Sequence, residues 1–274
     1  MGYIKTRDGT DLYVKDWGSG RPVVLLHGWP LSADSWDDHA YALANAGFRA
    51  IAYDRRGFGR SAQPWSGYDY DTLTDDLADV LEATGARDGA TLIGFSMGGG
   101  EVARYMSRYE GRGVIAAGLI ASVVPYLLKT KDNPHGAPAS ELEKIGQGIL
   151  ADRPAFFRSF FKSFYGTGVT AHPVSDETLD WAWRVAMQAG LKPTLACAES
   201  FGHTDFRPDL AAFRVPTLLV HGTGDTTVPI DATARAVKKA MPDAQLVEYD
   251  GAPHGLTVTH KDRLTSDLLT FLGG

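Results

Sequence analysis

The sequence predicts an α/β protein with a mostly parallel sheet of eight strands and helices on both of its faces. Short β-rich runs alternate with amphipathic helical segments along most of the 274 residues. Several of the β-rich runs are continuously apolar, which is typical of strands that are covered on both faces. Apolar residues make up 44% of the chain and charged residues 22%, so disordered, collagen-like and coiled-coil proteins are excluded.

The first two expected strands, residues 3–6 and 12–16, flank the turn dipeptide Asp8-Gly9 and read as a β-hairpin. The other six strands are expected at residues 22–26, 48–53, 90–93, 114–121, 217–220 and 245–249. Between and after these strands, apolar residues recur at helical spacing. Helices are therefore expected at residues 35–46, 72–84, 97–109, 232–241 and 260–272.

One interval, residues 125–208, breaks the alternation because no convincing strand pattern occurs in it. Helix signals replace the strands. Ser140 and Glu143 have the spacing of a capping box, and Ser175 precedes an acidic first turn. We therefore expect a helical cap, residues 125–208, inserted into a core domain that is formed by residues 1–124 and 209–274.

The charge balance and the cysteine content exclude several partners and environments. The net charge is −6 and the sequence contains no basic block, so nucleic acid is not an expected partner. The longest apolar stretch, residues 114–128, is interrupted by Gly118, Ser122 and Pro125 and is too short to cross a bilayer, so no membrane partner is expected. Cys197 is the only cysteine, and the first residues contain no apolar signal region. These features predict a cytoplasmic protein.

Neither the histidines nor the glycines form a known metal or nucleotide motif. The eight histidines include no HExxH pair and have no cysteine partners at metal-binding spacing, which argues against a zinc site. The glycine-rich stretch after residue 93 is not a P-loop, because no Lys-Ser or Lys-Thr pair follows it. We expect the chemistry of this protein to need no metal and no cofactor.

The strongest chemical signal is Gly94-Phe95-Ser96-Met97-Gly98, which lies between an expected strand and an expected helix. A sharp strand-to-helix turn exposes a serine hydroxyl, as nucleophilic attack requires. The same turn crowds the backbone, so positions two before and two after the serine need glycine. A tightly packed glycine-rich turn would read similarly, but the strand-turn-helix context favours Ser96 as a nucleophile.

A serine nucleophile needs a histidine base and a carboxylate that orients the base. In chain order, the candidates are Asp225, after the strand at 217–220, and His254, after the strand at 245–249. Both should emerge at the carboxyl edge of the sheet, where Ser96 also lies. Asp54 and Asp205 are competing acids, but the arginines beside them favour structural ion pairs.

The oxyanion of an acyl-transfer intermediate needs two backbone N–H donors. Met97 N–H, at the start of the helix after the nucleophile, is the first candidate. The loop after the strand at 22–26 reads His27-Gly28-Trp29-Pro30, and the second donor should come from it. We assign this role to Trp29 N–H, because Pro30 has no N–H.

Four separated stretches of the sequence resemble the same group of proteins. They are Val24-Leu-Leu-His-Gly-Trp-Pro30, Tyr53-Asp-Arg-Arg-Gly-Phe-Gly-Arg-Ser61, the stretch from Gly94 to Tyr105, and Thr204-Asp-Phe-Arg-Pro-Asp-Leu210. They are similar to the α/β-hydrolase fold superfamily, in the subgroup of cofactor-free haloperoxidases, arylesterases and perhydrolases. Epoxide hydrolases share the His-Gly-aromatic-Pro stretch, but their nucleophile is an aspartate, so Ser96 argues against that activity.

The resemblance implies hydrolysis of small carboxylic esters through an acyl-enzyme. With a carboxylate such as acetate and with hydrogen peroxide, it also implies formation of a peracid that oxidises halide. In this subgroup, a proline after the loop tryptophan is associated with peroxide use. Pro30 restricts Trp29 to extended conformations and so fixes where the Trp29 carbonyl points. The resemblance further implies a homo-oligomer.

The expected cap contributes apolar side chains to the substrate pocket. Asp152 and Pro154 open an aromatic helix that ends at Gly166, and five phenylalanines recur along it at helical spacing. Most of them should pack between the cap and the core. The residues expected to line a small, dry acyl site are Trp29, Phe95, Phe161, Phe201 and Val228.

Two other classes of function remain open at this point. The same scaffold supports amidases, lactamases and hydroxynitrile lyases, and a lyase would be expected to place a Lys or a Thr in the pocket. A non-catalytic ligand receptor with this fold is the third possibility, and an intact set of Ser96, Asp225 and His254 argues against it.

Overall fold

The structure is a computed structural model, which describes residues 2–168 and 170–273. It confirms the predicted fold class, because one sheet holds eight strands in the order β1-β2-β4-β3-β5-β6-β7-β8. The strands are β1 Tyr3–Lys5, β2 Asp11–Gly18, β3 Pro22–Leu26, β4 Arg49–Tyr53, β5 Ala90–Phe95, β6 Val114–Ile120, β7 Thr217–Gly222 and β8 Gln245–Tyr249.

Of the eight strands, β2 runs against the others. β1 pairs antiparallel with β2 as the expected hairpin, and β2 pairs antiparallel with β4. All pairs from β4 to β8 are parallel, so the carboxyl ends of six strands meet at one edge. The central strands β3 and β5 are almost completely buried, which explains their continuous apolar runs.

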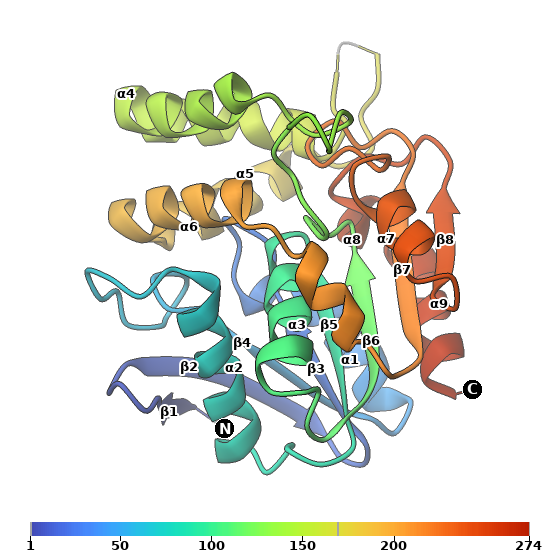
Figure 1. Cartoon of the computed structure of the whole chain (residues 1–274). Helices are drawn as coiled ribbons and strands as arrows, with labels where there is room; N and C mark the ends of the chain where they lie inside the picture. Colours follow the sequence, from blue (N-terminus) through green and yellow to red (C-terminus); the bar gives the residue numbers. More distant parts are fainter. Residues whose placement is uncertain (1, 169, 274) are drawn as a thin grey trace.

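Helices cover both faces of the sheet (Figure 1). Helix α2, Tyr70–Ala83, and helix α3, Met97–Arg108, pack together on one face, whereas α1, Asp37–Asn45, packs with α9, Lys261–Gly273, on the other. The remaining short helices near the sheet are η1 Ala33–Trp36, η2 Arg207–Ala212, α7 Ala234–Ala240 and α8 Leu256–Thr259. The sequence did not predict α8, whose four residues are too few for a periodic pattern.

Three further helices fill the interval between β6 and β7. They are α4 Ala139–Phe164, α5 Asp176–Gln188 and α6 Leu191–His203, and they lie beyond the arrowheads of the parallel strands (Figure 1). Within the described part of residues 125–208, isolated bridges occur but no strand does. The expected absence of strands from this interval therefore holds wherever the structure can test it.

The predicted helix starts in this interval have different outcomes. The capping box at Ser140 is wrong, because Pro138 is the N-cap of α4 and no side chain caps that end. Asp152 interrupts α4 with non-helical angles, and its carboxylate accepts a hydrogen bond from Ala155 N–H, as an N-terminal cap does. Ser175 caps α5 as predicted, by accepting from Thr178 N–H.

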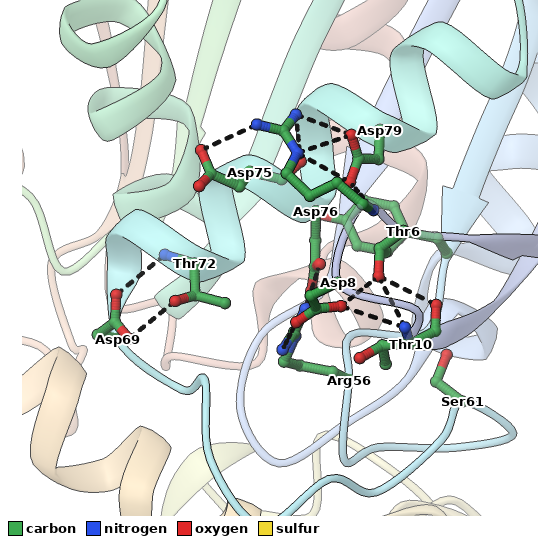
Figure 2. Close-up of polar contacts among 12 residues, drawn as sticks. Thr6, Asp8, Thr10, Arg56, Ser61, Asp69, Thr72, Asp75, Asp76 and Asp79 are labelled. Atoms are coloured by element: carbon green, nitrogen blue, oxygen red, sulfur yellow. Dashed lines mark hydrogen bonds and ion pairs between the residues drawn. The ribbon is translucent and has the colours of Figure 1, made fainter.

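A buried ion pair fixes the segment that follows β4 against the hairpin and α2 (Figure 2). Arg56 donates from Nε to Asp76 on α2 at 2.6 Å and from Nη1 to Asp8 in the hairpin turn at 2.9 Å. Asp8 also accepts from the Thr6 hydroxyl and from Thr10 N–H. The chain that leaves the carboxyl end of β4 is thereby anchored to two separate elements.

No helix in the described residues is long and apolar enough to cross a membrane. This agrees with the hydropathy pattern of the sequence.

Candidate active site

Ser96 lies on a sharp turn between β5 and α3. Its backbone has φ +53° and ψ −116°, a conformation that a residue with a side chain adopts at a cost of about 1–3 kcal/mol. A Cβ at Gly94 would lie 2.4 Å from the Gly98 carbonyl, and one at Gly98 would lie 2.4 Å from the Leu26 carbonyl oxygen. Both glycines are therefore required by close backbone contacts, as the motif predicted.

The side chains of Ser96, His254 and Asp225 form one hydrogen-bonded chain. The Ser96 hydroxyl lies 2.9 Å from His254 Nε2, and His254 Nδ1 lies 2.6 Å from Asp225 Oδ2. Because a carboxylate only accepts, Nδ1 carries the proton and Nε2 is free to accept the proton of the serine. This is the geometry that a serine, a general base and its orienting acid require.

Close contact between two loops brings Asp225 and His254 together. A Cβ at Gly222 would lie 2.1 Å from the Ala252 carbonyl oxygen, and one at Gly224 would lie 2.6 Å from the Gly251 carbonyl oxygen. Gly224 N–H also donates to the Ala252 carbonyl. The loop after β7 can therefore lie directly against the loop after β8 only because glycine occupies these two positions.

Asp225 is buried but remains ionised. Burial opposes its charge, yet the neighbouring His254 and His221 stabilise the carboxylate and hold the pKa of Asp225 below its ordinary value. In addition, Oδ1 accepts from the backbone N–H groups of Thr227 and Val228, each at 2.8 Å. The carboxylate is thus fixed in orientation and available to stabilise a positive charge on His254.

The two competing acids are structural. Asp54 is buried and accepts from the backbone and side chain of Arg60, and from Ala33 N–H, rather than from the arginines that follow it directly. Asp205 pairs with Arg207 at the surface. Neither of these carboxylates forms a hydrogen bond to His254 in the described residues.

The loop after β3 passes directly over Ser96. A Cβ at Gly28 would lie 2.7 Å from the Phe95 ring and 3.1 Å from Ser96 Cβ, so only glycine allows this approach. Within residues 2–168 and 170–273, no hydrogen-bond acceptor is found for the backbone N–H of Trp29 or of Met97. Both groups are therefore available to an oxyanion, and Met97 is the first residue of α3, where the helix dipole also favours negative charge.

A buried ion pair links the two segments that hold these N–H groups. Arg55 donates to Glu101, which lies one turn after Met97 on α3, and it also donates to the His27 carbonyl at 2.7 Å. The Arg55 backbone N–H donates to His27 Nε2 at 3.0 Å. Burial and the nearby charge of Arg55 hold the pKa of His27 well below its ordinary value, so this histidine is neutral. Sequence reasoning missed this connection, because buried partners distant in sequence leave no local pattern.

A cavity of about 40 Å³ adjoins Ser96 and His254. Trp29, Phe201 and Val228 line it, in agreement with the positions expected to form the acyl site. The side chains that complete the lining were not singled out from the sequence, namely Val123, Leu127, Leu142, Ile145, Phe160 and Thr227. Most of the wall is apolar, so the cavity suits a small acyl group.

Two expected lining residues, Phe95 and Phe161, do not line this cavity. Phe95 is fully buried against the His254 ring, at 5.3 Å between centroids, and supports the base from behind. Phe161 packs against Phe157 and Tyr165. Consecutive helical residues point about 100° apart. Because Phe160 on α4 faces the cavity, Phe161 points into the protein interior instead.

A larger cavity of about 450 Å³ shares part of its wall with the first. Leu142, Ile145, Phe160 and Thr227 line both, and the outer part includes Lys144 and Glu141. It lies between α4 and the loop after Asp225 and therefore offers space for the part of a substrate that does not fit beside Ser96.

Among the described residues, no group of three or more His, Cys, Asp or Glu side chains has a geometry that could hold a metal ion.

The fold and this geometry define the class of serine hydrolases built on an α/β sheet. Residues 21–261 match the family described as alpha/beta hydrolase fold. The chain belongs to this family, in the group that contains non-heme haloperoxidases and an esterase/perhydrolase. The resemblance inferred from the four sequence stretches is thereby confirmed.

Three relatives illustrate the similarity. The chain is 42% identical over 274 residues to a non-heme chloroperoxidase of Kitasatospora aureofaciens, with 99% of each chain covered. It is 39% identical over 276 residues to a bifunctional esterase/perhydrolase of Acinetobacter calcoaceticus, again with 99% of each covered. The crystal structure of a bromoperoxidase from Bacillus anthracis superposes with a TM-score of 0.95 at 42% identity, covering 100% of both chains.

Proposed function

We propose that this protein is a serine esterase that acts on small carboxylic esters and that also forms peracids from hydrogen peroxide. The observation that carries the proposal is the hydrogen-bonded chain from Ser96 through His254 to Asp225 beside an apolar cavity. The names of the relatives, which include an esterase/perhydrolase and haloperoxidases, support the same activity.

The proposed reaction begins with attack of Ser96 Oγ on the ester carbonyl carbon, while His254 Nε2 takes the hydroxyl proton. Trp29 N–H and Met97 N–H stabilise the oxyanion that forms, each contributing about 3 kcal/mol. Asp225 stabilises the resulting imidazolium. The carbon–oxygen bond to the alcohol then breaks, His254 returns the proton to the leaving alcohol, and the acyl group remains on Ser96.

A second nucleophile completes the turnover. Water or hydrogen peroxide gives its proton to His254 and attacks the acyl carbon, and Ser96 leaves with that proton. Water yields a carboxylic acid, and peroxide yields a peracid that can oxidise halide in solution. Pro30 favours the peroxide branch in this proposal, because it restricts the direction of the Trp29 carbonyl beside the acyl group.

The test of the esterase proposal compares wild type with Ser96→Ala on an aryl acetate. The variant should lose about a million-fold in kcat, because the serine forms the covalent intermediate. Asp205→Asn, which alters a surface ion pair, is a control that should keep wild-type activity. Retention of ester hydrolysis by Ser96→Ala would exclude Ser96 as the nucleophile.

The peroxide branch is tested with Pro30→Leu. The ratio of peracid formation to ester hydrolysis, measured in the same buffer with and without hydrogen peroxide, should fall by about tenfold, the equivalent of one lost hydrogen bond to the incoming peroxide. An unchanged ratio would show that Pro30 does not influence the choice between water and hydrogen peroxide as the acyl acceptor. It would leave the esterase proposal intact, because hydrolysis does not require this residue.

A lyase activity on the same scaffold is the second candidate, and one observation favours it. Thr227 lines the cavity beside Ser96, and a polar group of this kind is what a hydroxynitrile lyase would use. Release of aldehyde and cyanide from a cyanohydrin by the wild type would support the lyase. Hydrolysis of aryl acetate without such release would exclude it.

Three further expectations are proposals of the same kind. We propose that residues 125–208 act as a cap on a core formed by residues 1–124 and 209–274, supported by the position of α4–α6 beyond the strand ends. We also propose a homo-oligomer, supported by the sequence resemblance, and a cytoplasmic location, supported by the single cysteine of the sequence. Light scattering of the purified protein should give a mass that is a multiple of 29.6 kDa.

A further inference from the structure

A second histidine contacts the carboxylate of Asp225, at the same oxygen, Oδ2, that bonds to His254. His221, the penultimate residue of β7, has its Nε2 atom 2.9 Å from the Val228 carbonyl oxygen and 3.2 Å from Asp225 Oδ2. Its side chain and that of Asp225 are both buried. The proton on Nε2 can therefore be shared between one backbone carbonyl and the triad carboxylate.

The surroundings of His221 define its protonation state. Nδ1 is buried and has no hydrogen-bond partner in the described residues. A proton on Nδ1 would thus be an unsatisfied donor in the interior, which is costly. The imidazole is therefore neutral with its single proton on Nε2, where both oxygen acceptors are located.

Four donor groups surround the carboxylate of Asp225. Oδ1 accepts from Thr227 N–H and Val228 N–H, Oδ2 accepts from His254, and Oδ2 also lies 3.2 Å from His221 Nε2. A carboxylate has about four lone-pair sites, so these four donors are as many as it can accept. Each donor that stabilises the negative charge reduces the basicity of Oδ2 toward the proton on His254 Nδ1.

The other charged groups around this cluster are few and neutralised. On β8, Glu248 lies opposite His221 in the sheet register, and it pairs with Arg235 of α7. Arg235 also pairs with Asp231, in the loop before α7. The groups that reach the cluster from β5 and the turn after it are uncharged: Phe95 packs against the His254 ring, and Ser96 bonds to His254. His221 is the remaining titratable group in direct contact with the triad acid.

We propose that His221 is a positioning residue that sets the pH at which His254 becomes an active base, by donating its Nε2 proton to Asp225 and to the loop carbonyl of Val228. This inference rests on the proposed function of Ser96, His254 and Asp225. Without the donor, Asp225 binds the imidazolium of His254 more tightly, so the base holds its proton to a higher pH. Activity that requires neutral His254 then begins at a higher pH.

The test is the pH profile of kcat/KM for aryl acetate hydrolysis by His221→Leu and His221→Gln. The acid limb is the low-pH part of the profile, where kcat/KM rises as His254 loses its proton. Leucine removes the donor at similar volume, so the acid limb should move to higher pH by roughly half to one pH unit, the size that one hydrogen bond to a carboxylate can impose. Glutamine places an amide N–H near the position of Nε2 and should keep the acid limb within about a quarter of that shift.

A second readout does not depend on turnover. The low-field proton resonance of the His254–Asp225 hydrogen bond should move further downfield in His221→Leu, because that hydrogen bond becomes stronger. His39→Leu is the matched control, since His39 is equally buried and bonded to Thr257 and Thr265 but does not contact Asp225. It should lower stability without moving the acid limb or the resonance.

An acid limb in folded His221→Leu that coincides with the wild-type limb would overturn the inference, even if the variant is less stable. If leucine prevents folding, His221→Asn replaces it, because the shorter amide cannot reach Asp225 and should show the same upward shift relative to glutamine. Failure of the proposed function is distinguished by Ser96→Ala. A wild type whose hydrolysis does not depend on Ser96 refutes the triad, whereas Ser96-dependent hydrolysis with an unmoved limb refutes only the role of His221.

Discussion

The active-site wall formed by the sheet and the wall formed by helix α4 are fixed in different ways. On the sheet side, Ser96, Asp225 and His254 each follow a strand, and hydrogen bonds and obligatory glycines set their positions. On the cap side, one helix supplies Leu142, Ile145 and Phe160, which are held by apolar and aromatic contacts alone.

Because of this difference, the arrangement of the proposed catalytic groups and the selectivity for the acyl group depend on different parts of the fold. The register of a parallel sheet allows little variation in where strand ends lie, so the groups proposed for catalysis have one arrangement. The rotation of a helix about its axis decides which side chain faces a cavity, and packing determines that rotation. We therefore propose that the chemistry depends on the sheet edge and that selectivity for the acyl group depends on α4.

Among substitutions of residues other than Ser96, Asp225→Asn should have the largest effect on kcat. Loss of the carboxylate removes the group that orients His254 and stabilises its charged form, so kcat for aryl acetate should fall by about 10⁴-fold. Steady-state kinetics with the purified variant measure this loss. Asp54→Asn, which alters the competing acid near the sheet edge, should lose stability while leaving the rate of folded enzyme near wild type. If Asp54→Asn lost more kcat than Asp225→Asn, the acid that orients His254 would be Asp54 and the assignment of Asp225 would be wrong.

Glu101→Leu tests whether the sheet wall depends on a buried charge. The change leaves the guanidinium of Arg55 buried without its partner, and the free energy of unfolding should fall by about 3–5 kcal/mol. Urea denaturation followed by circular dichroism measures it. Glu141→Leu breaks an exposed pair with Lys144 on α4 and should change stability by at most about 1 kcal/mol. Similar losses for both variants would contradict the contrast between the two walls.

Phe160→Ala should change selectivity and leave the chemistry in place. Removal of this ring enlarges the small cavity, so the kcat/KM ratio of butanoate to acetate esters should rise by about tenfold, as methylene-sized differences in an apolar pocket allow. Phe161→Ala is the matched control. It should cost about 3–5 kcal/mol of stability because the ring is buried, but it should not alter the acyl preference. If Phe161→Ala changed the ratio of butanoate to acetate hydrolysis and Phe160→Ala did not, Phe161 would line the acyl site as the sequence predicted.

The sequence predicted most of what the sheet determines. Continuous apolar runs identified the buried strands, and the Gly-x-Ser-x-Gly motif identified the turn at Ser96, because tight backbone contacts leave a local signature of glycines. The positions of Ser96, Asp225 and His254, each after a different strand of the parallel sheet, predicted a common edge, where the structure joins their side chains. Their catalytic role remains a prediction for the experiments above.

The cap could be predicted only in outline. The spacing of the phenylalanines indicated an aromatic helix, but not which of Phe160 and Phe161 reaches the cavity, because neighbouring residues on a helix differ by a rotation that only tertiary packing sets. The capping box at Ser140 failed for a related reason, since the N-cap of α4 is Pro138, two residues earlier. The contact between His221 and Asp225 was not predicted, because nothing in the sequence distinguishes His221 from an ordinary buried strand residue.

The central claim is that Ser96 carries the acyl group during turnover. Mass spectrometry of the protein quenched during reaction with a slowly deacylating aryl ester tests this claim directly. The account predicts a single added acyl mass on the peptide that contains Ser96, absent from Ser96→Ala. An acyl group on another residue, or turnover by the wild type with no covalent species under conditions where deacylation limits the rate, would contradict it.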